Sequence, residues 1–222
     1  MYFVAGTDTD CGKTFIASAL LHRAKQTGST LGIKPIASGC ELTEQGLRNC
    51  DALCLITEST YELDYQQVNP FAFAPAIAPH IAAEQMGMVL TPSAIAEHIN
   101  QLPFGEVDFA LVEGAGGWRL PLGEGKFLSD VVKQLSLPVI LVVGVKLGSL
   151  NHALLTQEAM LADGIHIVGW VANMVDPNMS CPQENLNSLK TMMASPCLGV
   201  VPHLSSMDIA KAASYLDLNA LA

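Results

Sequence analysis

The 222 residues are half hydrophobic and 14% charged, a length and composition that fit one α/β domain with a full core spanning residues 1–222. The formal net charge of −10, from 11 basic and 21 acidic residues, argues against nucleic acid as a partner, because binding a phosphate backbone needs clustered Lys and Arg. No apolar run reaches membrane-spanning length and no signal-peptide pattern precedes the first apolar run, so we expect a cytoplasmic protein without a membrane partner.

Strand-like and helix-like segments alternate along the chain. Apolar, β-branched runs predict strands over residues 2–6, 31–36, 107–113, 138–144, 165–172 and 197–201. Helical periodicity predicts helices over 13–27, 91–101, 127–136, 149–163 and 183–193. This alternation indicates an α/β fold with a mostly parallel sheet and helices on both faces. The proline-rich stretch 61–92 is the least regular part, and we expect it to run over the surface.

A glycine-bounded loop, Gly6-Thr-Asp-Thr-Asp-Cys-Gly-Lys-Thr14, joins the first strand to the first helix. This is the context of a phosphate-binding P-loop, although five residues separate the glycines where the general pattern has four. Backbone N–H groups and the helix N-terminus would bind a polyphosphate, Lys13 would reach its terminal phosphates, and the Thr14 hydroxyl would reach Mg²⁺. The pattern predicts a fold of the P-loop NTPase type that binds a nucleoside triphosphate through Asp10, Cys11, Gly12, Lys13, Thr14 and Phe15.

Polar side chains stand at the ends of four further strands. Lys34 ends the second strand, Glu113 the third and Asn173 the fifth, while the segment 146–151 follows the fourth. Ligands of open α/β sheets bind beyond the carboxyl ends of the strands, so we expect these residues to converge with Lys13 on one edge. A lysine emerging at a strand end and a turn-forming asparagine are the plain alternatives for Lys34 and Asn173.

Two carboxylates, Asp51 and Glu113, are candidate magnesium ligands, because Mg²⁺ prefers oxygen ligands and takes one or two carboxylates together with phosphate oxygens. Glu113 ends an apolar strand and precedes a glycine-rich segment whose backbone can approach phosphate, namely Gly114, Ala115 and Gly116. Asp51 lies in a helix-compatible stretch, where capping of the helix N-terminus is the alternative. Asn173 is expected to pair with the nucleotide base, with Pro202, His203 and Leu204 beside the ring.

The six cysteines form no paired metal-ligand pattern and are expected to be free thiols. Cys11 is the one to watch, since a thiol in an anion-binding loop beside Lys13 should be unusually reactive. The alternative is that a small residue fits the loop.

Several segments in order resemble the dethiobiotin synthetase family. They are residues 6–14, 33–39 (Ile-Lys-Pro-Ile-Ala-Ser-Gly), 47–53 (Leu-Arg-Asn-Cys-Asp-Ala-Leu), 112–118 (Val-Glu-Gly-Ala-Gly-Gly-Trp), 145–152 (Val-Lys-Leu-Gly-Ser-Leu-Asn-His) and 169–173 (Gly-Trp-Val-Ala-Asn). The resemblance is dense from residue 2 to about 175 and thins in the C-terminal fifth, where only Leu198-Gly-Val-Val-Pro202 matches well.

The resemblance implies an ATP-dependent ligase of biotin synthesis that closes a ring on 7,8-diaminononanoate. One amine takes up carbon dioxide to give a carbamate, ATP phosphorylates the carbamate, and the second amine attacks the mixed anhydride. Lys34 would hold the anionic intermediate against the γ-phosphate, with Lys13 and Mg²⁺ as the other positive charges. The family also implies a homodimer, in which the neighbouring subunit's residues of the segment 148–151 bind the substrate carboxylate. The substrate contacts implied are Thr9, Lys34, Ser38, Gly148, Ser149 and Asn151.

Two other functions remain open from the residues alone. A partitioning-type P-loop ATPase would carry a signature lysine near the start of the loop, where this chain has Thr7. A small-molecule kinase would usually close an arginine-bearing lid over the phosphates, and the chain has three arginines in all. Ser149 or Asn151 could also serve only as the N-cap of the helix that follows.

Overall fold

The computed structural model describes residues 1–221, which fold around a six-stranded parallel sheet. The strands lie in the order β12, β11, β10, β1, β7, β2, and each pair of neighbours is parallel. Their bounds are β1 Tyr2–Gly6, β2 Thr30–Ile33, β7 Phe109–Glu113, β10 Val139–Gly144, β11 Ile167–Asn173 and β12 Cys197–Val201. The predicted α/β fold with a mostly parallel sheet is confirmed.

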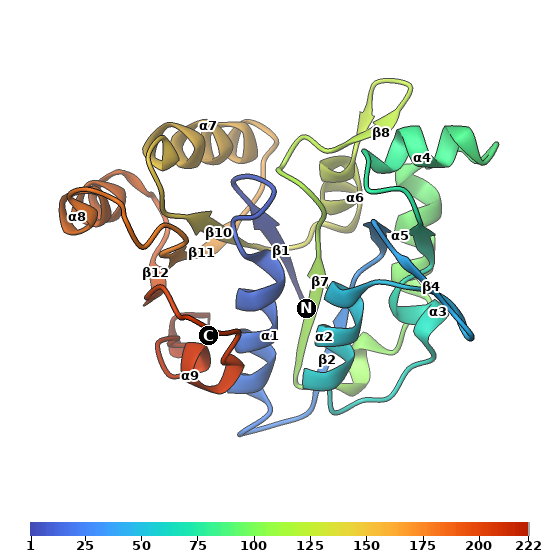
Figure 1. Cartoon of the computed structure of the whole chain (residues 1–222), viewed down its shortest axis with the longest axis horizontal. Coiled ribbons are helices and arrows are strands. Elements are labelled where there is room, and N and C mark those ends of the chain that lie inside the picture. The colour runs from blue at the N-terminus through green and yellow to red at the C-terminus, as the bar shows by residue number, and fades with distance from the viewer. Residues whose placement is uncertain (222) are drawn as a thin grey trace.

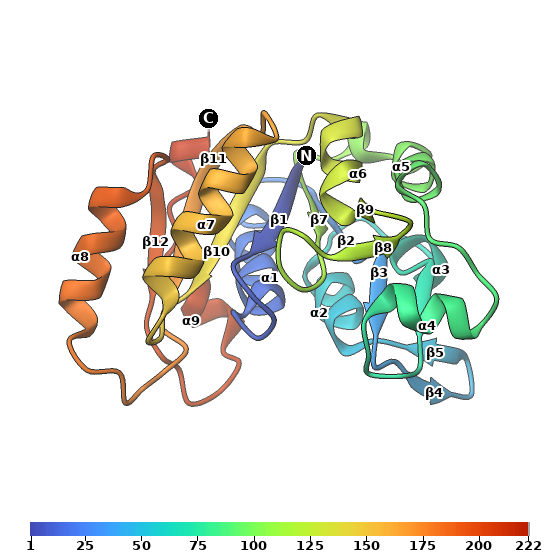
Figure 2. The same cartoon turned by 90° about the horizontal axis from the view of Figure 1, so that it is seen from above.

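Helices cover both faces of this sheet (Figure 1). One face packs against α1 (Lys13–Ala24) and α9 (Ile209–Ala213), with α2 (Cys50–Glu58) beside α1. The other face carries α5 (Pro92–Asn100), α6 (Leu128–Leu135), α7 (Ser149–Ala162) and α8 (Pro182–Met192), as Figure 2 shows from above. Because both faces are covered, strands such as β10 are buried at every residue and read as continuous apolar runs. No helix within residues 1–221 has both the length and the apolar character needed to cross a bilayer.

The second predicted strand, 31–36, is broken at Lys34 and Pro35. Residues Thr30–Ile33 form β2 at the edge of the main sheet, whereas Ile36–Ser38 form β3 and pair with β6 (Phe71–Phe73) in a separate two-stranded sheet. Proline has no N–H to donate to a ladder, so a strand readily ends before it. The break turns the chain away from the main sheet at Lys34, beyond the end of β2.

The stretch 61–92 is more ordered than its sequence indicates. It contains α3 (Tyr65–Val68), β6 and α4 (Pro79–Gln85), and it buries Val68, Phe73 and Ala82, so the prediction of a purely surface course is wrong. These elements are too short for their periodicity to be read from sequence. Other short elements also went unpredicted: β4 Glu41–Thr43, β5 Gly46–Arg48, η1 Phe104–Glu106, β8 Pro121–Gly123, β9 Lys126–Phe127, α9 and η2 Asn219–Leu221.

Candidate active site

The P-loop is shaped by its two glycines. A Cβ on Gly6 would collide with the Cys11 sulfur, and one on Gly12 would collide with the side-chain nitrogen of Asn173. Gly12 has φ 84°, in the left-handed region, and serves as the N-cap of α1 without any side-chain cap. The first-turn N–H groups of α1 therefore keep their hydrogen-bonding capacity for an anion, and the helix dipole favours negative charge there.

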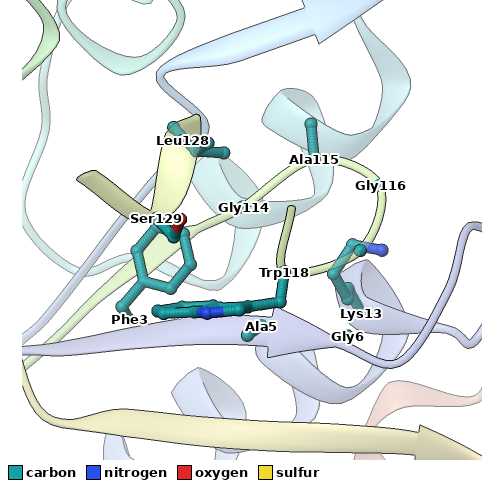
Figure 3. Close-up of a pocket in the computed structure, with 11 residues that line it drawn as sticks. Phe3, Ala5, Gly6, Lys13, Gly114, Ala115, Gly116, Trp118, Leu128 and Ser129 are labelled. Atoms are coloured by element: carbon teal, nitrogen blue, oxygen red, sulfur yellow. The ribbon is translucent and has the colours of Figure 1, made fainter. Parts of the chain in front are cut away.

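Lys13 begins α1 and bends back over the loop. Its Nζ donates to the backbone oxygen of Asp8 at 2.9 Å, and only 7% of the residue is exposed. The side chain lies between the main cavity described below and a small cavity lined by Gly6, Gly114 and Trp118 (Figure 3). A positive charge is thus held within the loop before any phosphate arrives.

A cluster of charged side chains lies beyond the ends of β2 and β7. The Lys34 ammonium contacts Glu113 Oε1 at 2.6 Å and Asp51 Oδ2 at 3.0 Å, and donates to the Gly114 carbonyl at 3.1 Å. Thr14 Oγ1 donates to the same Glu113 oxygen at 2.7 Å. Lys34 and Glu113 are 4% and 1% exposed, so this ion pair is buried. Four segments far apart in sequence meet here: the start of α1, the end of β2, the start of α2 and the end of β7.

Electrostatics keep the cluster charged. Burial alone would lower the pKa of Lys34, but attraction to Glu113 and Asp51 outweighs burial and raises the pKa above its ordinary value. Burial would raise the pKa of Asp51, but Lys34 outweighs it and the pKa lies below its ordinary value. Stability from the lysine is therefore lost only as the pH rises above its raised pKa, and stability from Asp51 only as the pH falls below about 4. Both groups are ionised at neutral pH.

The donor set fits a magnesium ion bound together with a polyphosphate. Glu113 Oε2 is buried and has no hydrogen-bond partner, so one carboxylate oxygen has its capacity unused. Asp51 and Thr14 supply two further oxygens in the same cavity. Across residues 1–221 no three His, Cys, Asp or Glu side chains are grouped to hold a metal by themselves. Phosphate oxygens and water would have to complete the shell, as is usual for Mg²⁺.

The main cavity, of about 780 Å³, lies at this edge of the sheet and brings together most of the predicted residues. The ones that line it are Thr9, Asp10, Gly12, Lys13, Thr14, Phe15, Lys34, Ser38, Asp51, Glu113, Ala115 and Gly116. The Ser38 hydroxyl is buried and has no partner, which leaves it available to a ligand. Gly114 lies just behind this wall, in the small cavity of Figure 3.

A second cavity, of about 450 Å³, is lined by the residues predicted for the base. They are Asn173, Pro202, His203 and Leu204, and Phe15 of the P-loop set borders both this cavity and the main one. Asn173 Nδ2 donates to the Cys11 carbonyl at 3.0 Å, so part of this amide holds the P-loop. Among the hydrogen bonds of residues 1–221, its Oδ1 takes part in none, and this oxygen is the one free for a ligand.

The structure decides two alternatives that the sequence left open. Cys11 is 1% exposed, packed under Gly6 and Gly144, and lines neither large cavity, so an accessible, reactive thiol is contradicted and the fitting of a small residue is favoured. Ser149 and Asn151 do not cap α7, because its N-cap is Gly148 with φ 91° and no side-chain hydrogen bond.

Gly148, Ser149 and Asn151 line neither large cavity, although they lie near the P-loop. Lys146, just before them, lies 3.5 Å from the Asp8 carboxylate. In this single chain the structure therefore does not bring the start of α7 together with Lys34 and Ser38.

Sequence reasoning missed one wall of the main cavity. It is formed by Asn49, by the segment 76–79 before and at the start of α4, and by Leu120 and Met207. Asn49, rather than Asp51, caps α2, accepting from the Ala52 N–H at 3.3 Å. The cap could have been predicted, because Asn is a favoured N-cap residue and Asn49 stands two residues before Asp51. The segment 76–79 could not have been, because its apolar side chains have no groups that indicate a binding site.

Comparisons with known proteins agree with this geometry. A family model described as an AAA domain matches residues 1–211. The chain is 54% identical to the ATP-dependent dethiobiotin synthetase BioD of Pseudomonas aeruginosa (strain LESB58), over 99% of this chain and 97% of that one. It is 51% identical to the BioD of Cellvibrio japonicus (strain Ueda107), over 99% and 96%. The septum site-determining protein MinD of Pyrococcus horikoshii OT3, solved with Mg-ADP, superposes with a TM-score of 0.58 at 16% identity, covering 99% of this chain and 88% of that one. This last likeness shows the P-loop NTPase fold.

Removing either candidate magnesium ligand should weaken the coupling between Mg²⁺ and nucleotide. We expect Glu113→Gln and Asp51→Asn each to raise the Mg²⁺ concentration needed for half-maximal ATP binding by roughly tenfold or more, measured by titration calorimetry. Glu184→Gln, on the exposed face of α8, is the control and should leave the titration unchanged. A candidate whose variant titrates like the control does not bind the metal.

Proposed function

The chain belongs to the family of ATP-dependent dethiobiotin synthetases, ligases of biotin biosynthesis, and we propose that its main cavity is where ATP and the diamine substrate react. Identity above 50% over nearly the whole chain favours this activity over the partitioning ATPase and the kinase that the residues alone left open. The observation that carries the site assignment is the buried Lys34–Glu113 pair beside Lys13 and Thr14. One domain would then bind the nucleotide and catalyse the reaction.

ATP would lie across both cavities, with its phosphates on the P-loop and its base in the second cavity. Phe15 borders both spaces, so a nucleotide can run past it from one to the other. The open N–H groups at the start of α1 and the Lys13 ammonium suit the β- and γ-phosphates. Glu113, Asp51 and Thr14 would hold Mg²⁺, which supplies charge stabilisation of the phosphoryl group that is transferred.

Lys34 is the residue we assign to the reacting centre. In the chain alone its charge is shared by Glu113, Asp51 and the Gly114 carbonyl. With the two carboxylates bound to a metal, the ammonium would be free to hold an anionic carbamate against the γ-phosphate. Positive charge placed where negative charge develops lowers the barrier, and no protein nucleophile is required. Lys34 is cationic in the chain alone, where the two carboxylates raise its pKa, and the anionic phosphate and carbamate would take over that effect once the carboxylates bound the metal.

The diamine would extend from Ser38 and Thr9 toward the start of α7 in the partner subunit of a homodimer. Like α1, α7 begins at a left-handed glycine without a side-chain cap, so its N-terminus can bind a carboxylate. Asn151 and Leu155 lie four residues apart on one exposed face of this helix, and Leu147 just before it is 90% exposed. An apolar face beside an anion site suits a second copy that contributes to a composite site.

Replacing Lys34 should separate binding from chemistry. We expect Lys34→Gln to bind ATP nearly as well as the natural enzyme and to lower kcat by roughly 10²–10³, the usual cost of losing one charge partner of the transition state. Diamine- and bicarbonate-dependent phosphate release measures kcat, with circular dichroism to verify folding and Lys190→Ala on α8 as the control. A kcat close to that of the control would exclude Lys34 from the mechanism.

Shortening Asn151 tests the shared site. We expect Asn151→Ala to raise KM for the diamine several-fold while KM for ATP stays unchanged, because the change removes binding at the far end of one substrate only. Glu184→Ala, an exposed carboxylate on α8, is the control. Sedimentation at assay concentration should find a dimer. An active monomer, or an unchanged diamine KM, would rule out the composite site.

A further inference from the structure

The segment after β7, residues 114–120, is flexible enough that contacts at its C-terminal end are required to fix its position. Three of its first four residues are glycines, which lose more conformational freedom on ordering than other residues, and Gly116 has φ 59°. Its near end is fixed, because the Gly114 N–H donates to the Val4 carbonyl at 3.0 Å and the Gly114 carbonyl accepts from Lys34. Ala115, Gly116 and, further on, Leu120 line the main cavity, so the position of this segment helps to set the shape of the site.

Between these cavity-lining residues stand Trp118 and Arg119, and both are bound by the carboxylate of Asp163. Trp118 Nε1 donates to Asp163 Oδ2 at 2.9 Å. The Arg119 guanidinium makes a two-pronged contact with the same carboxylate, at 2.7 Å to Oδ2 and 3.0 Å to Oδ1. Such forked pairs are the stronger and more directional kind. The Trp118 ring is also packed edge to face on Phe3 of β1, with centroids 6.5 Å apart.

The position of the Asp163 carboxylate is unfavourable for α7 itself. Asp163 is the C-cap of α7, where the helix dipole is negative and a carboxylate is unfavourable. Its side chain is 12% exposed, so burial adds to this cost. The two hydrogen bonds from Trp118 and Arg119, together with the second Arg119 contact at 2.7 Å, offset both effects, with Lys133 lying 3.9 Å away. We therefore attribute the position of Asp163 to its contacts with the segment 114–120 rather than to the stability of α7.

We propose that Asp163 is a positioning residue of the nucleotide site, which fixes the segment 114–120 against Lys13 by holding Trp118 and Arg119. Figure 3 shows the geometry: the Trp118 ring lies between Phe3 and Lys13, beneath the loop through Ala115 and Gly116. Releasing Trp118 would loosen the backbone that faces the phosphates. The inference rests on the proposed function in one respect, namely that the main cavity binds the phosphates of ATP.

The test compares Asp163→Ala with Glu184→Ala, an exposed carboxylate on the neighbouring helix α8. We expect Asp163→Ala to raise the Kd for ATP·Mg by about tenfold, by analogy with the loss of other outer residues that orient a site. KM for the diamine should change by less than about twofold, and Glu184→Ala should match the natural enzyme. Thermal denaturation of each variant establishes a temperature at which all are folded.

A double-mutant cycle tests whether Asp163 affects nucleotide binding through its contact with Arg119. Arg119→Ala should weaken ATP·Mg binding in the natural enzyme but add little in Asp163→Ala, because the partner is already absent. A purely structural role would lower Tm and leave Kd unchanged, and that result, or additive losses in the cycle, would overturn the proposal. If the natural enzyme released no phosphate with diamine and bicarbonate, the proposed function would fail, while the Kd values would still decide the role of Asp163.

Discussion

The buried ion pair between Lys34 and Glu113 is the interaction on which the rest of the site depends. Taking two charges out of water is costly, and such pairs are often no more stabilising than apolar residues of the same size. This pair is held at 2.6 Å by parts of the chain that the fold must place with care: the end of β2, turned aside by Pro35, and the end of β7. The buried charges of this pair are therefore better explained by the binding of a charged ligand than by a contribution to folding stability.

The fold also leaves several polar groups at this edge of the sheet without hydrogen-bond partners. Two helices, α1 and α7, begin at left-handed glycines without side-chain caps, whereas α2 and α5 are capped by Asn49 and Thr91. The uncapped N-termini, the free oxygen of Glu113 and the free hydroxyl of Ser38 are all capacities for hydrogen bonding that water or a ligand must meet. Stability lost locally in this way is a common feature of active sites.

Sequence alone predicted the sheet and the larger helices, because apolar runs and helical periodicity are local patterns. It also predicted the convergence of Lys13, Lys34 and Glu113, because each lies at or after the end of a strongly apolar strand. It could not predict the short elements within 61–92, whose order comes from packing against the rest of the chain. It could not decide between the two explanations of Cys11 for the same reason: the loop chemistry is local, but the burial of the thiol under Gly144 is tertiary. The link from Asp163 to Trp118 and Arg119 joins residues more than forty positions apart and left no trace in any motif.

The central claim is that Glu113 would bind Mg²⁺ together with the nucleotide and so leave Lys34 free for the reacting substrate. A crystal structure with Mg²⁺, a non-hydrolysable ATP analogue and the diamine tests it directly. The account predicts a Glu113 oxygen about 2.0–2.1 Å from the metal, or hydrogen-bonded to one of its waters, and Lys34 within hydrogen-bonding distance of the γ-phosphate or the substrate. A complex in which the metal is bound elsewhere and Lys34 keeps its 2.6 Å contact with Glu113 would contradict it.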